Sequence, residues 1–208
     1  MDTSYYETFN LPTVHLVDCN EEEILEITPK GVRTKNREIE LDMLILATGY
    51  DGLTGAMLAV DVKGRDGMKV SQKWADGACS YLGLMMAGFP NLFMTTGPNG
   101  PAALANIIRI SENDVDWIAT AIEYMAKNKQ TAMEPTAQAE EGWMTVVATL
   151  SKRSLLNKAK TWYLGANVKD KPQGLTMFVG GFPKYREYCG LATQDNYKAN
   201  FTFEASAS

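Results

Sequence analysis

The sequence has few of the residues that hold metal ions or form disulfide frameworks. Its three cysteines, Cys19, Cys79 and Cys189, are scattered, and His15 is the only histidine among 208 residues. No Cys-x-x-Cys pair is present, so neither a zinc site nor a set of disulfides is expected. We expect three free thiols that are buried or half-buried.

Long apolar runs, a signal peptide and a basic stripe are also missing. The longest apolar candidates, Met43–Ala47 and Tyr81–Ala87, have the length of strands and fall far short of the ~20 residues of a membrane helix. The first residues include no basic start and no apolar stretch. The net charge is -5 and the pI is about 5.0. The sequence therefore predicts a cytoplasmic protein that binds neither nucleic acid nor membrane.

A dinucleotide-binding fingerprint is missing too. No Gly-x-Gly-x-x-Gly follows an expected strand anywhere in the chain. That pattern supplies the close backbone approach and the helix N-terminus that hold a pyrophosphate. The chain by itself is therefore not expected to hold one.

The residues that are present predict an α/β fold in which helices follow strands. Met43–Ala47 is continuously apolar and ends in Thr48-Gly49, which is typical of a strand buried on both faces of a parallel sheet. Ile24–Ile27 alternates apolar and charged residues, as a half-buried strand does. Asp66-Gly67 predicts a hairpin turn. Other strands are expected at Val14–Val17, Val32–Thr34, Glu38–Leu41, Tyr81–Ala87, Leu92–Thr95 and Leu175–Val179.

Three helices are expected in the second half. The first has an apolar face, with Asp114 counted among its polar positions. Thr136 is a candidate N-cap for the second helix. The third is a short helix near Pro183–Leu191. The apolar faces are Val115, Ile118, Ile122 and Met125 in the first helix and Trp143, Val146, Val147 and Leu150 in the second.

Two glycine-containing motifs are candidate ligand sites. In Leu44–Tyr50, Ala-Thr-Gly follows an apolar strand, and small residues there allow the backbone to approach a cofactor or a neighbouring strand closely. Gly97-Pro98-Asn99-Gly100-Pro101 leads into a helix expected near Ala102–Asn106, and its amides would point outward at an electron-rich ligand. The alternatives are a buried strand that ends in a glycine turn and a rigid loop without a ligand.

Two further segments combine aromatic, glycine and basic residues. In Lys158–Asn167, Trp162 and Tyr163 stand beside Gly-Ala-Asn and near lysines, so an aromatic ring could cover a cofactor. The alternative for Trp162 is a packed aromatic anchor. In Gly180–Arg186, Lys184 and Arg186 are interpreted as solvated charges rather than catalytic groups.

In order and spacing, these segments resemble the C-terminal part of the Baeyer–Villiger monooxygenases, in the group of cyclohexanone and phenylacetone monooxygenases. The resemblance runs over almost the whole chain. It rests on Asp2–Asn10, Ile27–Gly31, the Ala-Thr-Gly strand, Asn91–Thr95, the Gly97–Pro101 loop, Trp162–Asn167 and Gly180–Arg186.

The resemblance implies a partial flavoprotein built from two dinucleotide-binding domains. Residues 1–49 would be the end of the NADP-binding domain with a connecting strand. Residues 50–208 would be the C-terminal part of the FAD-binding domain, with a helical segment and a cofactor-covering loop. The family uses FAD and NADPH to convert ketones to esters or lactones through a C4a-peroxyflavin.

The resemblance also implies site residues. Ala102, Ala103 and Leu104 would line the substrate or flavin, and Trp162 would lie on a mobile loop that closes over NADP. The full implied cofactor-binding set is Thr48, Gly49, Gly97, Pro98, Asn99, Gly100, Pro101, Ile107 and Trp162. No metal ligand is implied.

The family's two Gly-x-Gly-x-x-Gly motifs and its catalytic arginine would lie upstream of Met1, so no catalytic residue is implied here. Activity is then expected to need a separate N-terminal half. Without their neighbours, Met43–Ala47 and Leu92–Thr95 would be left with open edges and exposed apolar side chains, which predicts marginal stability or self-association. The alternatives are a non-catalytic binding module derived from the enzyme and a relative that oxygenates nitrogen or sulfur.

Overall fold

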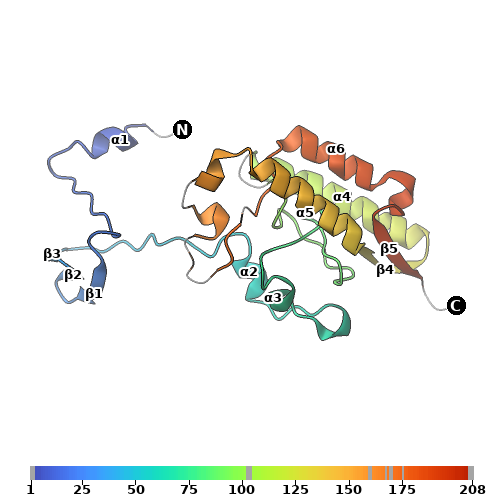
Figure 1. Ribbon diagram of the computed structural model, residues 1–208, viewed down its shortest axis with the longest axis horizontal. Helices are drawn as coiled ribbons and strands as arrows, with labels where there is room; N and C mark the ends of the chain where they lie inside the picture. Colours follow the sequence, from blue (N-terminus) through green and yellow to red (C-terminus); the bar gives the residue numbers. More distant parts are fainter. Residues whose placement is uncertain are drawn as a thin grey trace. The chain divides into compact units, whose positions relative to one another are not determined.

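A computed structural model of the chain describes residues 3–101, 105–158, 161–166, 168, 171–174 and 176–205. The chain divides into two compact units, Met1–Thr48 and Gly49–Ser208 (Figure 1). The assignment of the two parts, 1–49 and 50–208, to an NADP-binding and an FAD-binding domain stays a prediction.

The first unit contains a small antiparallel sheet. The short helix α1 (Tyr5–Thr8) precedes three strands in the order β1 (Ile24–Thr28), β2 (Gly31–Thr34) and β3 (Glu38–Glu40). The β1–β2 turn pairs Thr28 with Gly31, and Val32 pairs with Ile39 across β2 and β3. Three of the expected strands are therefore confirmed. The expected half-burial of Ile24–Ile27 is wrong, because Ile24, Leu25 and Ile27 are all exposed.

Two other strands expected in this unit do not form. Val14–Val17 has no regular structure, and neither has Met43–Ala47. A strand buried on both faces needs paired neighbours and covering helices, and the described residues of this unit provide neither for 43–47. Its side chains are consequently open to solvent, with Ile45 78% exposed. The expectation that this run exposes apolar side chains is confirmed.

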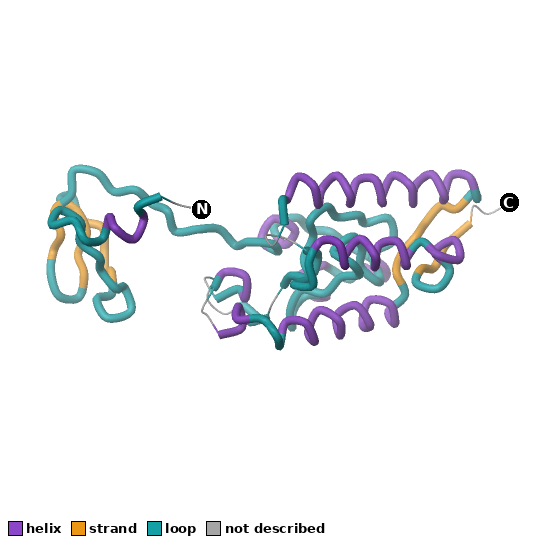
Figure 2. The backbone as a smooth tube through the Cα atoms, turned by 90° about the horizontal axis from the view of Figure 1, so that it is seen from above, coloured by secondary structure: helices purple, strands orange, loops and turns teal. Residues whose placement is uncertain are grey.

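Three helices and a two-stranded sheet are the longer regular elements described in the second unit. Helices α4 (Ile107–Lys127), α5 (Ala137–Ser151) and α6 (Phe182–Ala192) lie side by side in both views (Figures 1 and 2). Strands β4 (Gln130–Pro135) and β5 (Phe201–Ala205) pair antiparallel. The shorter elements are α2 (Gly55–Leu58), η1 (Arg65–Gly67), α3 (Val70–Lys73), η3 (Leu155–Lys158), η4 (Trp162–Leu164) and η5 (Gln194–Tyr197).

Helix α4 turns a different face to the core than expected, and the helix expected near Ala102–Asn106 falls largely outside the described residues. Asn106 caps it by accepting hydrogen bonds from the amides of Ile108 and Arg109. The predicted apolar face is partly wrong, because Val115 and Ile122 are exposed while Asp114 is buried. The buried residues are Ile110, Asp114, Trp117, Ala121 and Met125. The change of face is explained by hydrogen bonds to the Asp114 carboxylate on the inner side of the helix. Hydrophobicity alone assigns Asp114 to the solvent side.

The other two expected helices are confirmed. Thr136 caps α5 through its hydroxyl, which accepts a hydrogen bond from the Ala139 amide at 3.1 Å. Trp143 and Val147 are the buried members of the predicted apolar face of α5. Pro183 lies in the first turn of α6, where a missing N–H costs nothing.

The core of this unit includes an irregular segment that was expected to be a strand. Leu82, Leu84, Met85 and Met86 in Tyr81–Ala87 are buried, yet the segment forms only an isolated bridge between Tyr81 and Met85. Leu82 and Gly83 have φ values of 60° and 72°, which a strand cannot accommodate.

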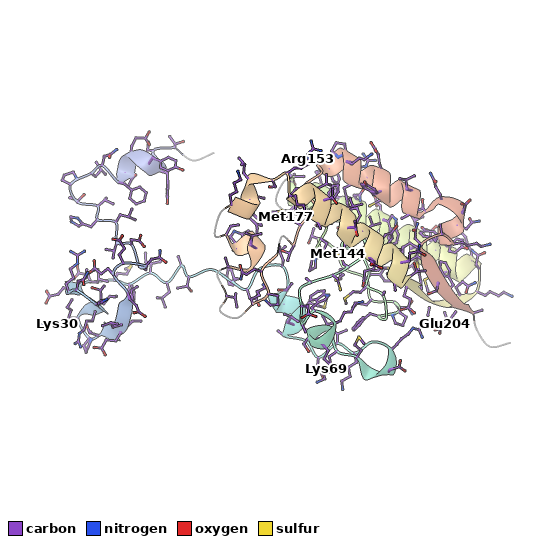
Figure 3. The ribbon with its side chains drawn as sticks, viewed as in Figure 1. Lys30, Lys69, Met144, Arg153, Met177 and Glu204 are labelled. Carbon is purple, nitrogen blue, oxygen red and sulfur yellow. The ribbon has the colours of Figure 1, made fainter. Side chains whose placement is uncertain are left out.

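Leu92–Thr95 and the described part of Leu175–Val179 are also irregular, so these strand predictions are wrong. They nevertheless contribute to the interior. Met94 is buried, and the fully buried Met177 lies among the side chains of this unit (Figure 3). Apolar content did not predict their backbone, and the expectation that Leu92–Thr95 exposes its apolar side chains is wrong for Met94.

Asp66-Gly67 lies in a turn between Lys63 and Lys69, which form a bridge, as a hairpin turn requires. The sheet of β4 and β5 was not anticipated. Among the described residues, no helix is both long and apolar enough to cross a lipid bilayer.

Candidate functional site

The Gly97–Pro101 loop is buried and packs against the turn at Leu82–Gly83. A Cβ atom on Gly97 would lie 2.4 Å from the Gly83 carbonyl oxygen, and one on Gly83 would lie 2.7 Å from Gly100 Cα. Ser80 Oγ donates to the Pro98 carbonyl at 2.6 Å. Close contact between two backbones therefore explains why glycine occupies these positions.

The amides of this loop are largely used inside the protein. The Asn99 amide donates to the Thr176 carbonyl at 2.7 Å, and the Gly100 amide donates to the Gly97 carbonyl at 3.1 Å. The Gly100 carbonyl accepts from the Phe178 amide at 2.8 Å. The expectation that the amides of Asn99 and Gly100 point outward at a ligand is therefore wrong.

A buried carboxylate holds the residue before the loop. Thr96 has φ 49°, a strained value for a β-branched residue, and its amide donates to Asp114 Oδ2 at 2.9 Å. The Tyr185 hydroxyl lies 2.9 Å from Asp114 Oδ1 and 3.0 Å from the Leu82 carbonyl oxygen. Burial raises the pKa of Asp114, and the hydrogen bonds to Thr96 and Tyr185 partly offset that effect.

One buried donor at the loop is left unsatisfied. Asn99 Nδ2 has no hydrogen-bond partner within the described part of the chain, and Asn99 Oδ1 lies 3.2 Å from Ser80 Oγ. An unpaired buried amide costs about 1–3 kcal/mol. The atom is shielded from solvent, so a ligand would reach it only after neighbouring groups move.

The residues around Trp162 form a second part of the site. We use the term strap for the described residues of the segment between 161 and 176, which are 161–166, 168, 171–174 and 176. Trp162 is 44% exposed, so it is not a buried core anchor. Its ring lies against the backbone of Gly52, where a Cβ atom would be 2.8 Å from Trp162 Cε3. Lys171 Nζ forms an ion pair with Asp51.

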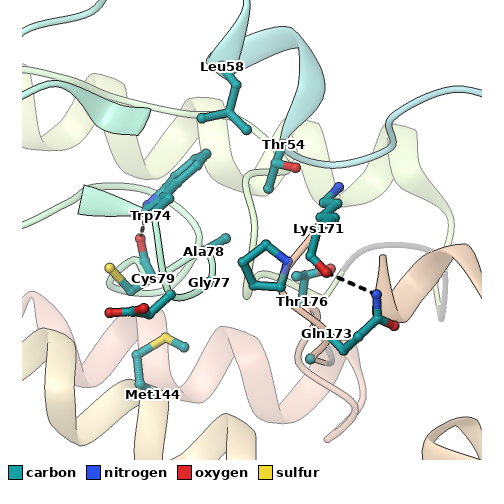
Figure 4. A pocket seen from close by; sticks show the side chains of 13 residues that line it. Thr54, Leu58, Trp74, Gly77, Ala78, Cys79, Met144, Lys171, Gln173 and Thr176 are labelled. Atoms are coloured by element: carbon teal, nitrogen blue, oxygen red, sulfur yellow. Dashed lines mark hydrogen bonds between the residues drawn. The ribbon is translucent and has the colours of Figure 1, made fainter. Parts of the chain in front are cut away.

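The strap also forms one wall of a cavity of about 250 Å³ (Figure 4). Pro172 and Thr176 lie on the strap side, and Leu58, Trp74 and Met144 are among the residues of the other walls. The Trp74 indole donates to the Cys79 carbonyl at 2.8 Å, which fixes its ring. Burial raises the pKa of the Cys79 thiol to about 11, so it is neutral at physiological pH.

The structure therefore brings some of the predicted residues together. Trp162 belongs to the strap, and the Gly97–Pro101 loop is hydrogen-bonded to Thr176 at the C-terminal end of the strap. Ile107 is exposed at the first residue of α4. Thr48 and Gly49 are exposed as well. Ala102, Ala103 and Leu104 lie outside the described residues.

Sequence reasoning missed several residues that organise this region. Asp51 follows the Ala-Thr-Gly motif almost directly, and this proximity was a usable signal. Asp114 gave no signal, because a polar residue in an amphipathic helix is ordinarily exposed, and Tyr185 lies in the Gly180–Arg186 segment without being assigned a role. Lys184 pairs with Glu187 on the surface, which agrees with its interpretation as a solvated charge.

The residues present would fit a flavin only in part. The loop offers one unsatisfied donor, Asn99 Nδ2, and a rigid buried backbone. The N-terminus of α4 is capped by its own Asn106 side chain. Within the described residues, nothing provides a glycine turn that could hold a pyrophosphate. No group of three or more His, Cys, Asp or Glu side chains that could hold a metal ion occurs in the described part either.

Comparisons with known proteins agree on one family. No protein-family model matches the chain. It is 38% identical over 186 residues to cyclohexanone 1,2-monooxygenase of Acinetobacter, covering 89% of this chain and 34% of that protein. It is 35% identical over 195 residues to a Baeyer–Villiger monooxygenase of Pseudooceanicola batsensis, covering 93% and 35%. It is 37% identical over 183 residues to phenazine N-monooxygenase of Lysobacter antibioticus, covering 88% and 34%.

Solved structures give the same result. Cyclohexanone monooxygenase from Rhodococcus sp. Phi1 bound to NADP+ matches with a TM-score of 0.90 and 35% identity, over 99% of this chain and 38% of that one. OTEMO in complex with FAD and NADP matches with a TM-score of 0.88 and 37% identity, over 98% and 37%.

Fold and sequence thus match one part of larger monooxygenases. The chain matches the C-terminal portion of the Baeyer–Villiger monooxygenases, which confirms the resemblance drawn from the sequence. It spans about a third of the length of these relatives.

Proposed function

We propose that this chain is the C-terminal part of an FAD- and NADPH-dependent Baeyer–Villiger monooxygenase that oxygenates ketones to esters or lactones. The observation that carries the proposal is its 38% identity to cyclohexanone 1,2-monooxygenase over 89% of the chain. Activity requires an N-terminal half, because the chain contains no pyrophosphate-binding glycine motif. The bound flavin and nicotinamide would supply the redox chemistry, and the protein would supply geometry and charge.

The chain's own residues would contribute position rather than proton transfer. The Gly97–Pro101 loop is held on one side by Ser80 and on the other by Phe178, so it would form a rigid wall beside the flavin. Thr48, Gly49 and Ile107 remain candidate cofactor contacts, and Ala102, Ala103 and Leu104 remain candidate substrate contacts. Trp162 would cover the nicotinamide cofactor, and its half-exposed ring is consistent with that role.

A fusion protein tests the proposal. The C-terminal third of the Acinetobacter enzyme would be replaced by this chain, and NADPH oxidation would be measured with and without cyclohexanone. We expect the purified fusion to contain FAD, to oxidise NADPH faster with the ketone and to form lactone. A fusion that folds, contains FAD and forms no oxygenated product from a panel of cyclic and linear ketones would contradict the proposal.

Oxygenation of a nitrogen atom is a second candidate activity. It is favoured by the 37% identity to a phenazine N-monooxygenase, which is nearly as high as the identity to the ketone-named relative. The same fusion, supplied with phenazine in place of the ketone, would distinguish the two activities by mass spectrometry of the product. The cytoplasmic location, and the N-terminal half or a second copy as partner, stay predictions.

A further inference from the structure

The strap is anchored firmly at one end. Two backbone hydrogen bonds close it on itself, from the Gly174 amide to the Leu164 carbonyl at 3.2 Å and from Thr176 to Tyr163 at 3.4 Å. At its C-terminal end, the Thr176 carbonyl accepts the Asn99 amide at 2.7 Å. That end is therefore joined to the buried glycine loop by the protein backbone.

Other residues of the strap are held by side chains that converge on two consecutive residues, Asp51 and Gly52. Lys171 Nζ forms an ion pair with Asp51 and also donates to the Gly52 carbonyl at 3.3 Å. The Trp162 ring lies on Gly52, and any side chain at that position would collide with it. The Lys171 stem packs beside Gly165, so its ammonium group is directed at Asp51.

These contacts differ in kind from those at the anchored end. Among the described residues, no backbone hydrogen bond joins Asp51 or Gly52 to the strap. The side chain of Lys171 is only 13% exposed and that of Asp51 is 36% exposed, so solvent screens this pair less than it screens a surface pair. Among the described residues, the contacts with Asp51 and Gly52 can thus break without loss of a backbone–backbone hydrogen bond, and the ion pair opposes that break.

We propose that Asp51 and Lys171 are positioning residues that latch the strap and thereby set the place of the Trp162 ring. Only the consequence for the nicotinamide cofactor rests on the proposed function, in which Trp162 covers that cofactor. The latch itself follows from contacts within this chain.

Limited digestion of the full chain with chymotrypsin tests the latch. Cleavage after Trp162, Tyr163 or Leu164 reports opening of the strap, and cleavage after the buried Phe178 or Tyr185 reports global unfolding. Lys171→Met keeps the apolar stem of the lysine and removes its charge, while Asp51→Asn removes the partner charge. A partly buried ion pair predicts about a fivefold faster strap cleavage in each variant.

Charge reversal and a matched control complete the design. The double variant Asp51→Lys with Lys171→Glu restores an attractive pair, and we expect its strap cleavage to return to within about twofold of the parent rate. Lys184→Met, which removes the exposed pair with Glu187, should leave the rate unchanged. Single variants with the parent rate, or with equal acceleration at the buried sites, would overturn the latch.

The fusion protein separates the latch from the proposed function. There, Lys171→Met should weaken NADPH binding several-fold and leave FAD content unchanged. If the strap opens faster but NADPH binds as before, the latch stands and the cofactor role of Trp162 falls. If NADPH binding weakens without faster strap cleavage, the latch falls.

Discussion

Trp162 and Trp143 offer a matched pair of substitutions with opposite expected consequences. Trp143 is 3% exposed, stacks on Phe178 with ring centroids 5.1 Å apart, and donates to the Asn99 carbonyl at 3.2 Å. Trp162 is 44% exposed, and its ring contacts the neighbouring Tyr163 ring and the backbone of Gly52. One ring therefore belongs to the core, and the other belongs to a surface strap.

The stability effects follow from this difference. Trp143→Ala should cost about 3–5 kcal/mol, as for other buried aromatic residues. For a chain of this length that is a fall in melting temperature of roughly 6–20 °C. Trp162→Ala removes contacts of a strap that can open separately, so the global melting temperature should fall by less than about 3 °C.

Thermal unfolding of the full chain, followed by circular dichroism, measures both effects. In the fusion protein, Trp162→Ala should also weaken NADPH binding and lower the yield of oxygenated product per NADPH oxidised. A drop for Trp162→Ala as large as that for Trp143→Ala, with unchanged NADPH kinetics, would make Trp162 a packing residue and would exclude its role over the cofactor.

Three further predictions concern stability and association. Glu140 accepts a hydrogen bond from the Ala87 amide at 2.8 Å and forms an ion pair with Lys73 at 2.6 Å. Glu140→Ala should therefore lower the free energy of unfolding in urea by roughly 2–4 kcal/mol, somewhat less than for a fully buried pair because the Lys73 side chain is 22% exposed. A loss as small as that of Lys184→Met would contradict this. The pKa of Asp114 is raised in the folded chain, so as pH rises its carboxyl group ionises first in the unfolded chain, near 3.8. Its contribution to stability is therefore fully present below that pH and is lost as pH rises through the pKa of the folded chain. In Asp114→Asn, the melting temperature at pH 6.5 minus that at pH 3.5 should therefore be more positive than in the parent, and an identical pH profile would show that Asp114 does not titrate in this way. Ile45→Glu should reduce self-association in light scattering, because Ile45 lies in an exposed apolar run, and unchanged oligomers would place the contact elsewhere.

Local signals in the sequence were enough to predict the elements that depend on local chemistry. Thr136 before α5 and Pro183 at the start of α6 act through their own backbone neighbours, so their roles hold in any surroundings. The β1–β2 turn at Pro29-Lys30 is of the same kind. These are the parts of the fold that sequence reasoning placed correctly.

Elements that depend on distant partners could not be predicted in this way. Met43–Ala47 has the composition of a central strand, but a strand exists only where neighbouring strands pair with it. Tyr81–Ala87 is buried because it is apolar, yet its close approach to Gly97 and Gly100 imposes a turn. Strand β4 is polar and ends in Pro135, and its pairing with Phe201–Ala205 spans about a third of the chain.

The candidate site shows the same division. The glycine loop and Trp162 were found because their residue types are unusual in sequence. Asp114, buried against Tyr185, and Lys171, paired with Asp51, were not found because each depends on a partner far along the chain. Long-range pairing of common charged residues leaves no local pattern.

We propose that this chain provides one part of a flavin site and needs the other part to hold FAD. The most direct measurement is FAD retention, by equilibrium dialysis, of the chain alone and of its fusion to the N-terminal part of the Acinetobacter enzyme. We predict weak or no retention by the chain alone and nearly one FAD per molecule in the fusion. Nearly stoichiometric retention by the chain alone, or a folded fusion without FAD, would contradict the claim.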